Sequence, residues 1–170
     1  MKAIQKAWVE NQRLNSLDKE PPTARALSRG RRIAVEGLER EIISIVCEIL
    51  EKFSYDICYR HESLYRRIDG YVFELLENPS DIVQNILESQ PNLTIVCNAR
   101  GYLSFLEHYS KSTNIPLLVL TGGGPELIKE VGRHTPNILE VPFRMQYLYY
   151  TIEEILKLKT WYQLRKCTGA

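Results

Sequence analysis

Between residues 32 and 143, short apolar segments alternate with amphipathic helical patterns, and this alternation is the feature that most limits the fold. The apolar segments lie at 32–37, 55–58, 93–98, 115–122 and 138–143. Strands separated by helical segments in this way form parallel sheets with helices on both faces. The nearly continuous apolar runs at 93–96 and 117–120 are typical of central strands that are covered on both sides. We therefore predict a three-layer, doubly wound α/β domain.

Five segments carry apolar residues at helical spacing. They lie at 38–52, 80–90, around Tyr102 and Phe105, at 125–132 and at 144–166. Ser80 is predicted to cap the second of them, because a serine hydroxyl can accept a hydrogen bond from the first turn of a helix. Pro125 opens the fourth at a position that favours proline.

Two parts of the chain fall outside this alternation. Residues 1–31 are predicted to form an N-terminal helix, with Trp8 on its apolar side, and a basic linker rich in Ser, Pro and Gly; residues 32–166 then form the domain. Residues 61–79 form an insertion after the second strand. Asp69-Gly70 is compatible with a hairpin turn, whereas 71–76 is equally compatible with an extra helical turn or an edge strand.

Composition and charge narrow the function. No apolar run approaches the roughly 20 residues that span a bilayer, and the N-terminus lacks an apolar signal segment, so we expect a cytoplasmic protein without a membrane partner. The four cysteines and three histidines show no metal-ligand spacing, so we expect reduced thiols and no metal. Residues 1–32 contain eight Lys and Arg against three acidic residues, which gives +5, while the remainder carries −4. This basic arm either binds nucleic acid or an acidic partner, or only keeps the chain in solution.

The order and the endings of these elements resemble the receiver domain of two-component response regulators, over about residues 32–159 without the insertion. The resemblance implies a flavodoxin-like, five-stranded parallel sheet of order 2-1-3-4-5. It also implies a site at the carboxyl ends of the strands. Receivers take a phosphoryl group on an aspartate after the third strand, and an acidic pair after the first strand holds Mg²⁺. A Thr or Ser ends the fourth strand, and a Lys precedes a proline after the fifth.

Most of these groups are missing here. The acidic pair falls on Gly37 and Leu38, with Glu36 one position early and Glu39 one late; the acceptor falls on Cys97 or Asn98. The resemblance thus implies a degenerate, non-enzymatic pseudo-receiver that needs no cofactor, with this set of site positions: Glu36, Gly37, Cys97, Asn98, Thr121 and Val141. Thr121 matches the switch hydroxyl, and Val141-Pro142-Phe143 keeps the proline and the phenylalanine without the lysine.

Two of these positions suggest other chemistry. Cys97 is either a redox-sensing thiol in place of the aspartate or, as we favour, a small buried side chain at a strand end. The loop Thr121-Gly122-Gly123-Gly124 before a helix could cradle an anion on backbone N–H groups, although it lacks the Lys-Ser/Thr of a phosphate-binding loop. We favour a simple strand-to-helix connection there.

Without chemistry, function is expected on a surface. The last helix begins with the tyrosines Tyr147, Tyr149 and Tyr150, and Trp161 follows further along. Together with Trp8 they form the predicted interaction surface, because aromatic residues are enriched at protein interfaces. We expect a protein partner or a fused output domain, and a homodimer. The alternatives are a small ligand- or nucleotide-binding domain that uses the 121–125 loop, and a nucleic-acid-associated regulator that uses the basic arm.

Overall fold

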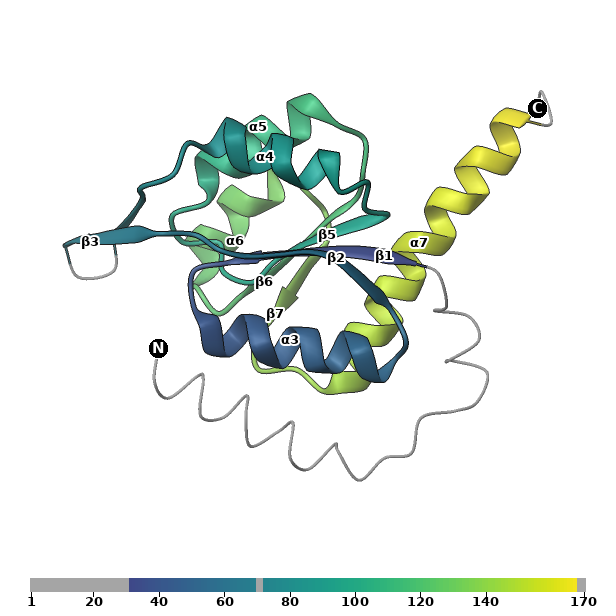
Figure 1. Ribbon diagram of the computed structural model, residues 1–170, viewed down its shortest axis with the longest axis horizontal. Helices are drawn as coiled ribbons and strands as arrows, with labels where there is room; N and C mark the ends of the chain where they lie inside the picture. Colours follow the sequence, from purple (N-terminus) through teal and green to yellow (C-terminus); the bar gives the residue numbers. More distant parts are fainter. Residues whose placement is uncertain (1–30, 70–71, 168–170) are drawn as a thin grey trace.

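The computed structural model describes residues 31–69 and 72–167, and the side chains of 72 and 158–167 are outside this description. Five strands form one parallel sheet: β1 (Arg32–Gly37), β2 (Asp56–Glu62), β5 (Leu93–Val96), β6 (Leu117–Thr121) and β7 (Ile138–Glu140). Their order is β2-β1-β5-β6-β7 (Figure 1). When the two strands of the insertion are not counted, this is the predicted order 2-1-3-4-5, and the predicted fold class is confirmed.

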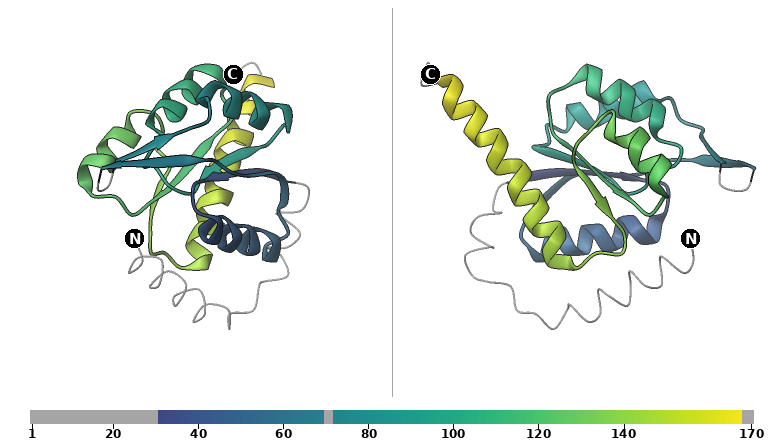
Figure 2. Two further views of the ribbon diagram at one scale, coloured as in Figure 1. Left: turned by 60° about the vertical axis from the view of Figure 1, so that its left-hand side comes forward. Right: turned by 180° about the vertical axis from the view of Figure 1, so that it is seen from behind.

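Helices cover both faces of the sheet, as Figures 1 and 2 show. On one face, α3 (Arg40–Lys52) and α7 (Met145–Cys167) bury an apolar cluster that includes Ile33 and Val35 of β1. On the other face, α4 (Pro79–Glu88), α5 (Leu103–Ser112) and α6 (Pro125–Gly132) cover a second cluster, which includes Ala34. Because successive residues of a strand point to opposite faces, the run Ile33-Ala34-Val35 supplies both clusters.

The insertion forms a β-hairpin. β3 (Tyr65–Asp69) and β4 (Val72–Leu75) pair with each other in antiparallel fashion and form a separate two-stranded sheet. The structure thus selects the hairpin from the alternatives that the sequence left open. The hairpin extends away from the helices and the main sheet (Figures 1 and 2). We refer to residues 64–76, apart from 70 and 71, as the arm.

Several predicted boundaries are corrected. Asn78, and not Ser80, caps α4: its Oδ1 accepts a hydrogen bond from the Ser80 N–H at 3.0 Å. The helix begins earlier because Pro79 occupies its first turn, where a missing N–H costs nothing. β2 continues to Glu62, four residues beyond the predicted end, because it pairs with β1 as far as Gly37. The predicted N-terminal helix and linker, including Trp8, lie outside the described residues, apart from Arg31. Within the described part of the chain, no helix is long and apolar enough to cross a membrane.

Candidate functional site

A buried carboxylate lies near the carboxyl end of β1. The side chain of Glu36 is fully buried and accepts hydrogen bonds from four other side chains. The hydroxyls of Ser63 and Tyr102 donate to Oε1 at 2.5 and 2.8 Å, and the hydroxyl of Tyr59 donates to Oε2 at 3.0 Å. Nδ1 of His61 lies 3.0 Å from Oε2. We call these five residues the Glu36 cluster.

The strand register explains why these residues meet. Glu36 pairs with His61 across β1 and β2, and Ala34 pairs with Tyr59. Tyr59, His61 and Ser63 are spaced by two, so their side chains leave the chain on the same face as Glu36. Tyr102, the residue before α5, approaches from that face. The cluster therefore connects the ends of β1 and β2 to the start of α5, with Tyr102 lying 66 residues after Glu36 in sequence.

Burial and hydrogen bonding act in opposite directions on Glu36. Burial raises the pKa of its carboxyl group, while the hydrogen bonds from Ser63 and Tyr102 and the nearby His61 partly offset this rise. Burial and the neighbouring carboxylate also raise the pKa of the hydroxyls of Tyr59 and Tyr102, which keeps both as proton donors. A carboxylate enclosed by four donors of its own chain is suited to holding structure together.

The position predicted for the acidic pair has no space for a carboxylate. A Cβ atom added to Gly37 would lie 2.9 Å from Cγ1 of Ile43 and 3.1 Å from Cβ of Cys97. Leu38 is buried in the second apolar cluster. Glu39 is half-buried at the start of α3, and burial, followed by the repulsion of Glu41, raises the pKa of its carboxyl group. Apolar atoms thus fill the space around this position.

Cys97, one of the two positions predicted for the phosphoacceptor, is buried in the cluster that α3 and α7 cover. Burial raises the pKa of its thiol well above the ordinary value, and the neighbouring Cys47 and Glu36 act in the same direction. Asn98 accepts a hydrogen bond from the N–H of Arg100 at 3.0 Å on its Oδ1, which stabilises the turn after β5. These observations support the interpretation of Cys97 as a core residue.

Cys97 is therefore expected to resist alkylation. In the folded protein near pH 8, we expect iodoacetamide to modify the half-buried Cys58 at least about ten times faster than Cys97, because the thiolate is the reactive form and burial suppresses it. Peptide mapping by mass spectrometry after timed quenching measures both rates. In urea the two rates should converge, and a fast reaction of Cys97 in the folded protein would restore the redox hypothesis.

The remaining site positions lie at the ends of the neighbouring strands. Thr121 is buried, and its Oγ1 accepts a hydrogen bond from the Gly123 N–H at 3.2 Å. The N–H of Val141 donates to the Thr121 carbonyl at 3.0 Å, just as the N–H of Cys97 donates to the Glu36 carbonyl at 2.8 Å. The structure thus brings the ends of β1, β5, β6 and β7 to one edge of the sheet. In the 121–124 loop, Gly123 lies against Leu127, so this loop packs on its own helix.

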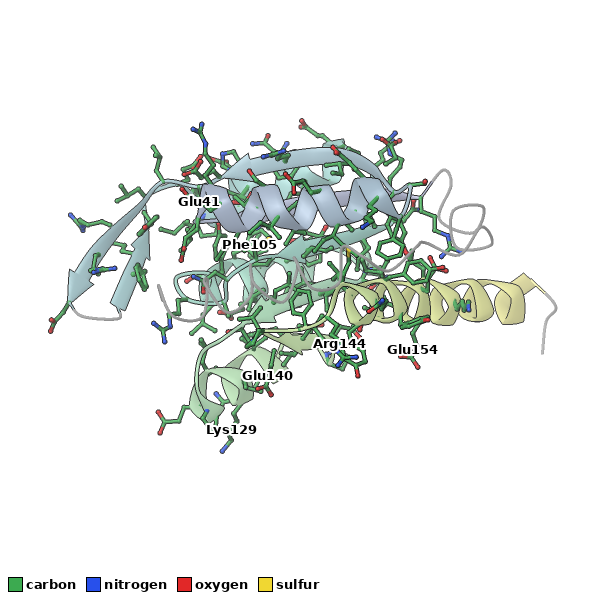
Figure 3. The ribbon with its side chains drawn as sticks, turned by 90° about the horizontal axis from the view of Figure 1, so that it is seen from below. Glu41, Phe105, Lys129, Glu140, Arg144 and Glu154 are labelled. Atoms are coloured by element: carbon green, nitrogen blue, oxygen red, sulfur yellow. The ribbon has the colours of Figure 1, made fainter. Side chains whose placement is uncertain are left out.

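The predicted interaction surface needs one correction. Tyr149 is buried, and its ring stacks on Phe53 with 4.6 Å between centroids and 16° between planes. Tyr147 and Tyr150 are exposed on α7. Figure 3 shows the exposed Glu140, Arg144 and Glu154 on the β7 and α7 side of the molecule. Trp161 is on α7, beyond the described side chains, and Trp8 is outside the described residues.

Sequence reasoning missed four members of the Glu36 cluster: Tyr59, His61, Ser63 and Tyr102. One signal was present, because Glu36 is the only charged residue within an otherwise apolar run, Ile33-Ala34-Val35-Glu36. The alternation of polar side chains at 59, 61 and 63 was a second signal. Among the described side chains, no group of three or more His, Cys, Asp or Glu is arranged to hold a metal ion.

Comparisons with known proteins place this architecture. No known family model matches the sequence, and no curated protein matches it. Solved structures do match. The signal receiver domain of a modulated diguanylate cyclase from Desulfovibrio desulfuricans G20 is 15% identical, with a TM-score of 0.59, and the match covers 76% of this chain and 96% of that one. NtrX from Brucella abortus, solved in complex with ADP, is 20% identical with a TM-score of 0.60, over 82% of this chain and 30% of that one.

A fusion that carries the trimeric coiled coil of yeast Spc42 is also similar, at 14% identity and a TM-score of 0.62 over 84% of this chain and 85% of that one. At sequence identities this low, the similarity to these structures is a similarity of fold alone. The sheet order and these matches together show that the chain has the flavodoxin-like fold of response-regulator receiver domains.

Proposed function

We propose that this chain is a pseudo-receiver, a signalling module that works through protein contacts without accepting a phosphoryl group. The observation that carries the proposal is the filled position at Gly37, where Ile43 and Cys97 leave no space for a metal-binding carboxylate. The one carboxylate that does lie at this strand end, Glu36, is enclosed by four side chains of its own chain. Phosphoryl transfer in receivers depends on Mg²⁺ and on charged groups that stabilise the transferred phosphate.

The contact surface that we propose is the exposed side of α7. Tyr147 and Tyr150 are exposed there, whereas Tyr149 stacks on Phe53 and holds this part of the helix against the core. Exposed tyrosines supported by a rigid helix suit an interface, because they bury much area at little cost in side-chain entropy. The occupant would be a protein partner or a fused output domain. A homodimer, ligand binding at 121–124 and nucleic-acid binding by the basic arm stay predictions.

The direct test is a phosphorylation assay. After incubation with acetyl phosphate and Mg²⁺, we expect the intact protein to show no added mass of a phosphoryl group, because neither Cys97 nor Asn98 offers a carboxylate. A receiver with its complete acidic site, treated in parallel, is the positive control. A phosphoryl adduct on any aspartate or glutamate, labile to hydroxylamine, would contradict the proposal.

A further inference from the structure

The arm carries several exposed apolar side chains. Leu64, Ile68 and Leu76 have 67%, 59% and 55% of their surface exposed. Single exposed apolar residues are ordinary, but here three of them belong to one small hairpin that extends from the body (Figures 1 and 2). A two-stranded hairpin is also marginal by itself, so its fixed position needs support.

The inner face of the arm is partly covered by the body of the domain. Phe73 is buried, with Tyr65 packed edge-on against its ring and the Arg67 guanidinium 5.5 Å from the ring centroid. Cβ of Phe73 would lie 3.4 Å from a Cβ built on Gly101, so the arm meets the body closely at this point. Leu75 packs against the second apolar cluster. Phe73 is therefore covered, whereas Tyr65 of the same face keeps 37% of its surface exposed.

The root of the arm is fixed to the Glu36 cluster. The Leu64 N–H donates to Oε2 of Glu77 at 2.8 Å, and Oε1 of Glu77 lies 3.3 Å from Nε2 of His61. The Leu76 N–H donates to the Leu64 carbonyl at 2.9 Å, and the Ser63 N–H donates to the Gly37 carbonyl at 2.9 Å. These bonds connect the root of the arm to the ends of β1 and β2.

The outer face has a pattern that complements itself. Leu64 and Leu76 are neighbours at the root, and Arg66 and Glu74 are cross-strand partners that form an ion pair in the middle. Ile68 lies towards the tip, where the register of the two strands shifts between Arg67 and Asp69. The central pair is exposed and neutral as a whole, with side-chain exposures of 65% and 46%. A second copy related by a two-fold axis along the arm would place Arg66 opposite Glu74 of that copy, and Leu64 opposite its Leu76.

We propose that the outer face of the arm binds the same face of a second copy of this chain. The occupant is a second copy because the two-fold arrangement places each Arg66 opposite a Glu74 and each Leu64 opposite a Leu76. The inference goes beyond the proposed function, since it holds whether or not the chain accepts phosphate. A hairpin of this size buries less than the roughly 1,600 Å² of a standard interface, so the dimer should be weak and concentration-dependent.

Charge reversal tests this with the full chain. Arg66→Glu leaves acids at both 66 and 74, and Glu74→Arg leaves bases at both positions, so each variant alone should raise the Kd of self-association at least about tenfold, as measured by sedimentation velocity. The two variants mixed in equal amounts should associate with each other, and the double variant Arg66→Glu/Glu74→Arg should regain self-association. An exposed ion pair contributes little to stability, so circular dichroism should show all variants folded.

Arg133→Glu is the matched control. It reverses a charge in another exposed ion pair, Arg133–Glu130, whose side-chain exposures of 63% and 44% nearly equal those of the arm pair. This variant should associate like the wild type. The proposal is overturned if the wild type stays monomeric at every concentration reached, if the arm variants associate as the wild type does, or if the mixture does not associate. Loss of association in Tyr150→Ala, with the arm variants unaffected, would move the interface to α7.

Discussion

Replacement of Glu36 by alanine is expected to cost about 3–5 kcal/mol of folding free energy, a large part of the stability of a domain of this size. The alanine removes the common acceptor of Tyr59, His61, Ser63 and Tyr102 and leaves a buried cavity lined by their donors. The loss is smaller than the sum of four hydrogen bonds, because the variant also avoids burying a charge. Urea unfolding followed by circular dichroism measures the change.

Two variants make this result specific. Glu36→Gln keeps one acceptor oxygen in a side chain of the same size, so it should lose clearly less stability than the alanine variant. Glu140→Ala removes an exposed carboxylate at the end of another strand of the same sheet and should change stability by no more than about 0.5 kcal/mol. If Glu36→Ala lost less than about 1 kcal/mol, water or rearranged donors would be replacing the carboxylate, and the Glu36 cluster would not be a structural centre.

The sheet could be predicted because its strands are buried on both faces. Residues 117–120 are apolar throughout and 93–96 apart from Thr94, and such runs are typical of strands covered on both faces. The length of β2 was underestimated because Tyr59, His61 and Ser63 appear polar in sequence. In the folded protein these side chains form hydrogen bonds with the buried Glu36. The pairing that brings these side chains to Glu36 includes a register shift between Ile33 and Ala34, and the local sequence does not determine this shift.

The failure at Tyr149 has a similar cause. Helical spacing places residue 149 beside 145 and 152, both of which are buried, so the residue lies at the margin of the inward face. Whether a tyrosine at this margin is buried depends on what lies opposite, and the partner Phe53 comes from the end of another helix.

The insertion remained ambiguous because residues 71–76 fit a strand and a helical turn equally, and pairing with Tyr65 to Asp69 decides between them.

An attempt to restore the missing acidic residue should be even more damaging. Gly37→Asp is expected to destabilise the fold by about 4 kcal/mol or more, because the added side chain overpacks the core and its charge becomes buried. Its Cβ would meet Ile43 at 2.9 Å and Cys97 at 3.1 Å, and its carboxylate would enter an apolar cluster beside the buried Glu36. Thermal and urea unfolding quantify the loss, and acetyl phosphate with Mg²⁺ should still leave the variant unmodified.

Glycine-to-alanine changes separate the cost of overpacking from the cost of burying the charge. Gly37→Ala adds only the Cβ atom, so it should cost about 1–3 kcal/mol through overpacking. At Gly132 an added Cβ has no neighbour within 4 Å, so Gly132→Ala should be neutral or slightly stabilising, since alanine favours a helix more than glycine does. Should Gly37→Asp fold as stably as the wild type, Ile43 and Cys97 must yield space readily, and steric filling would then not be what keeps an acid out of this strand end. An equal loss in the alanine and aspartate variants would assign the whole effect to packing and none to the buried charge.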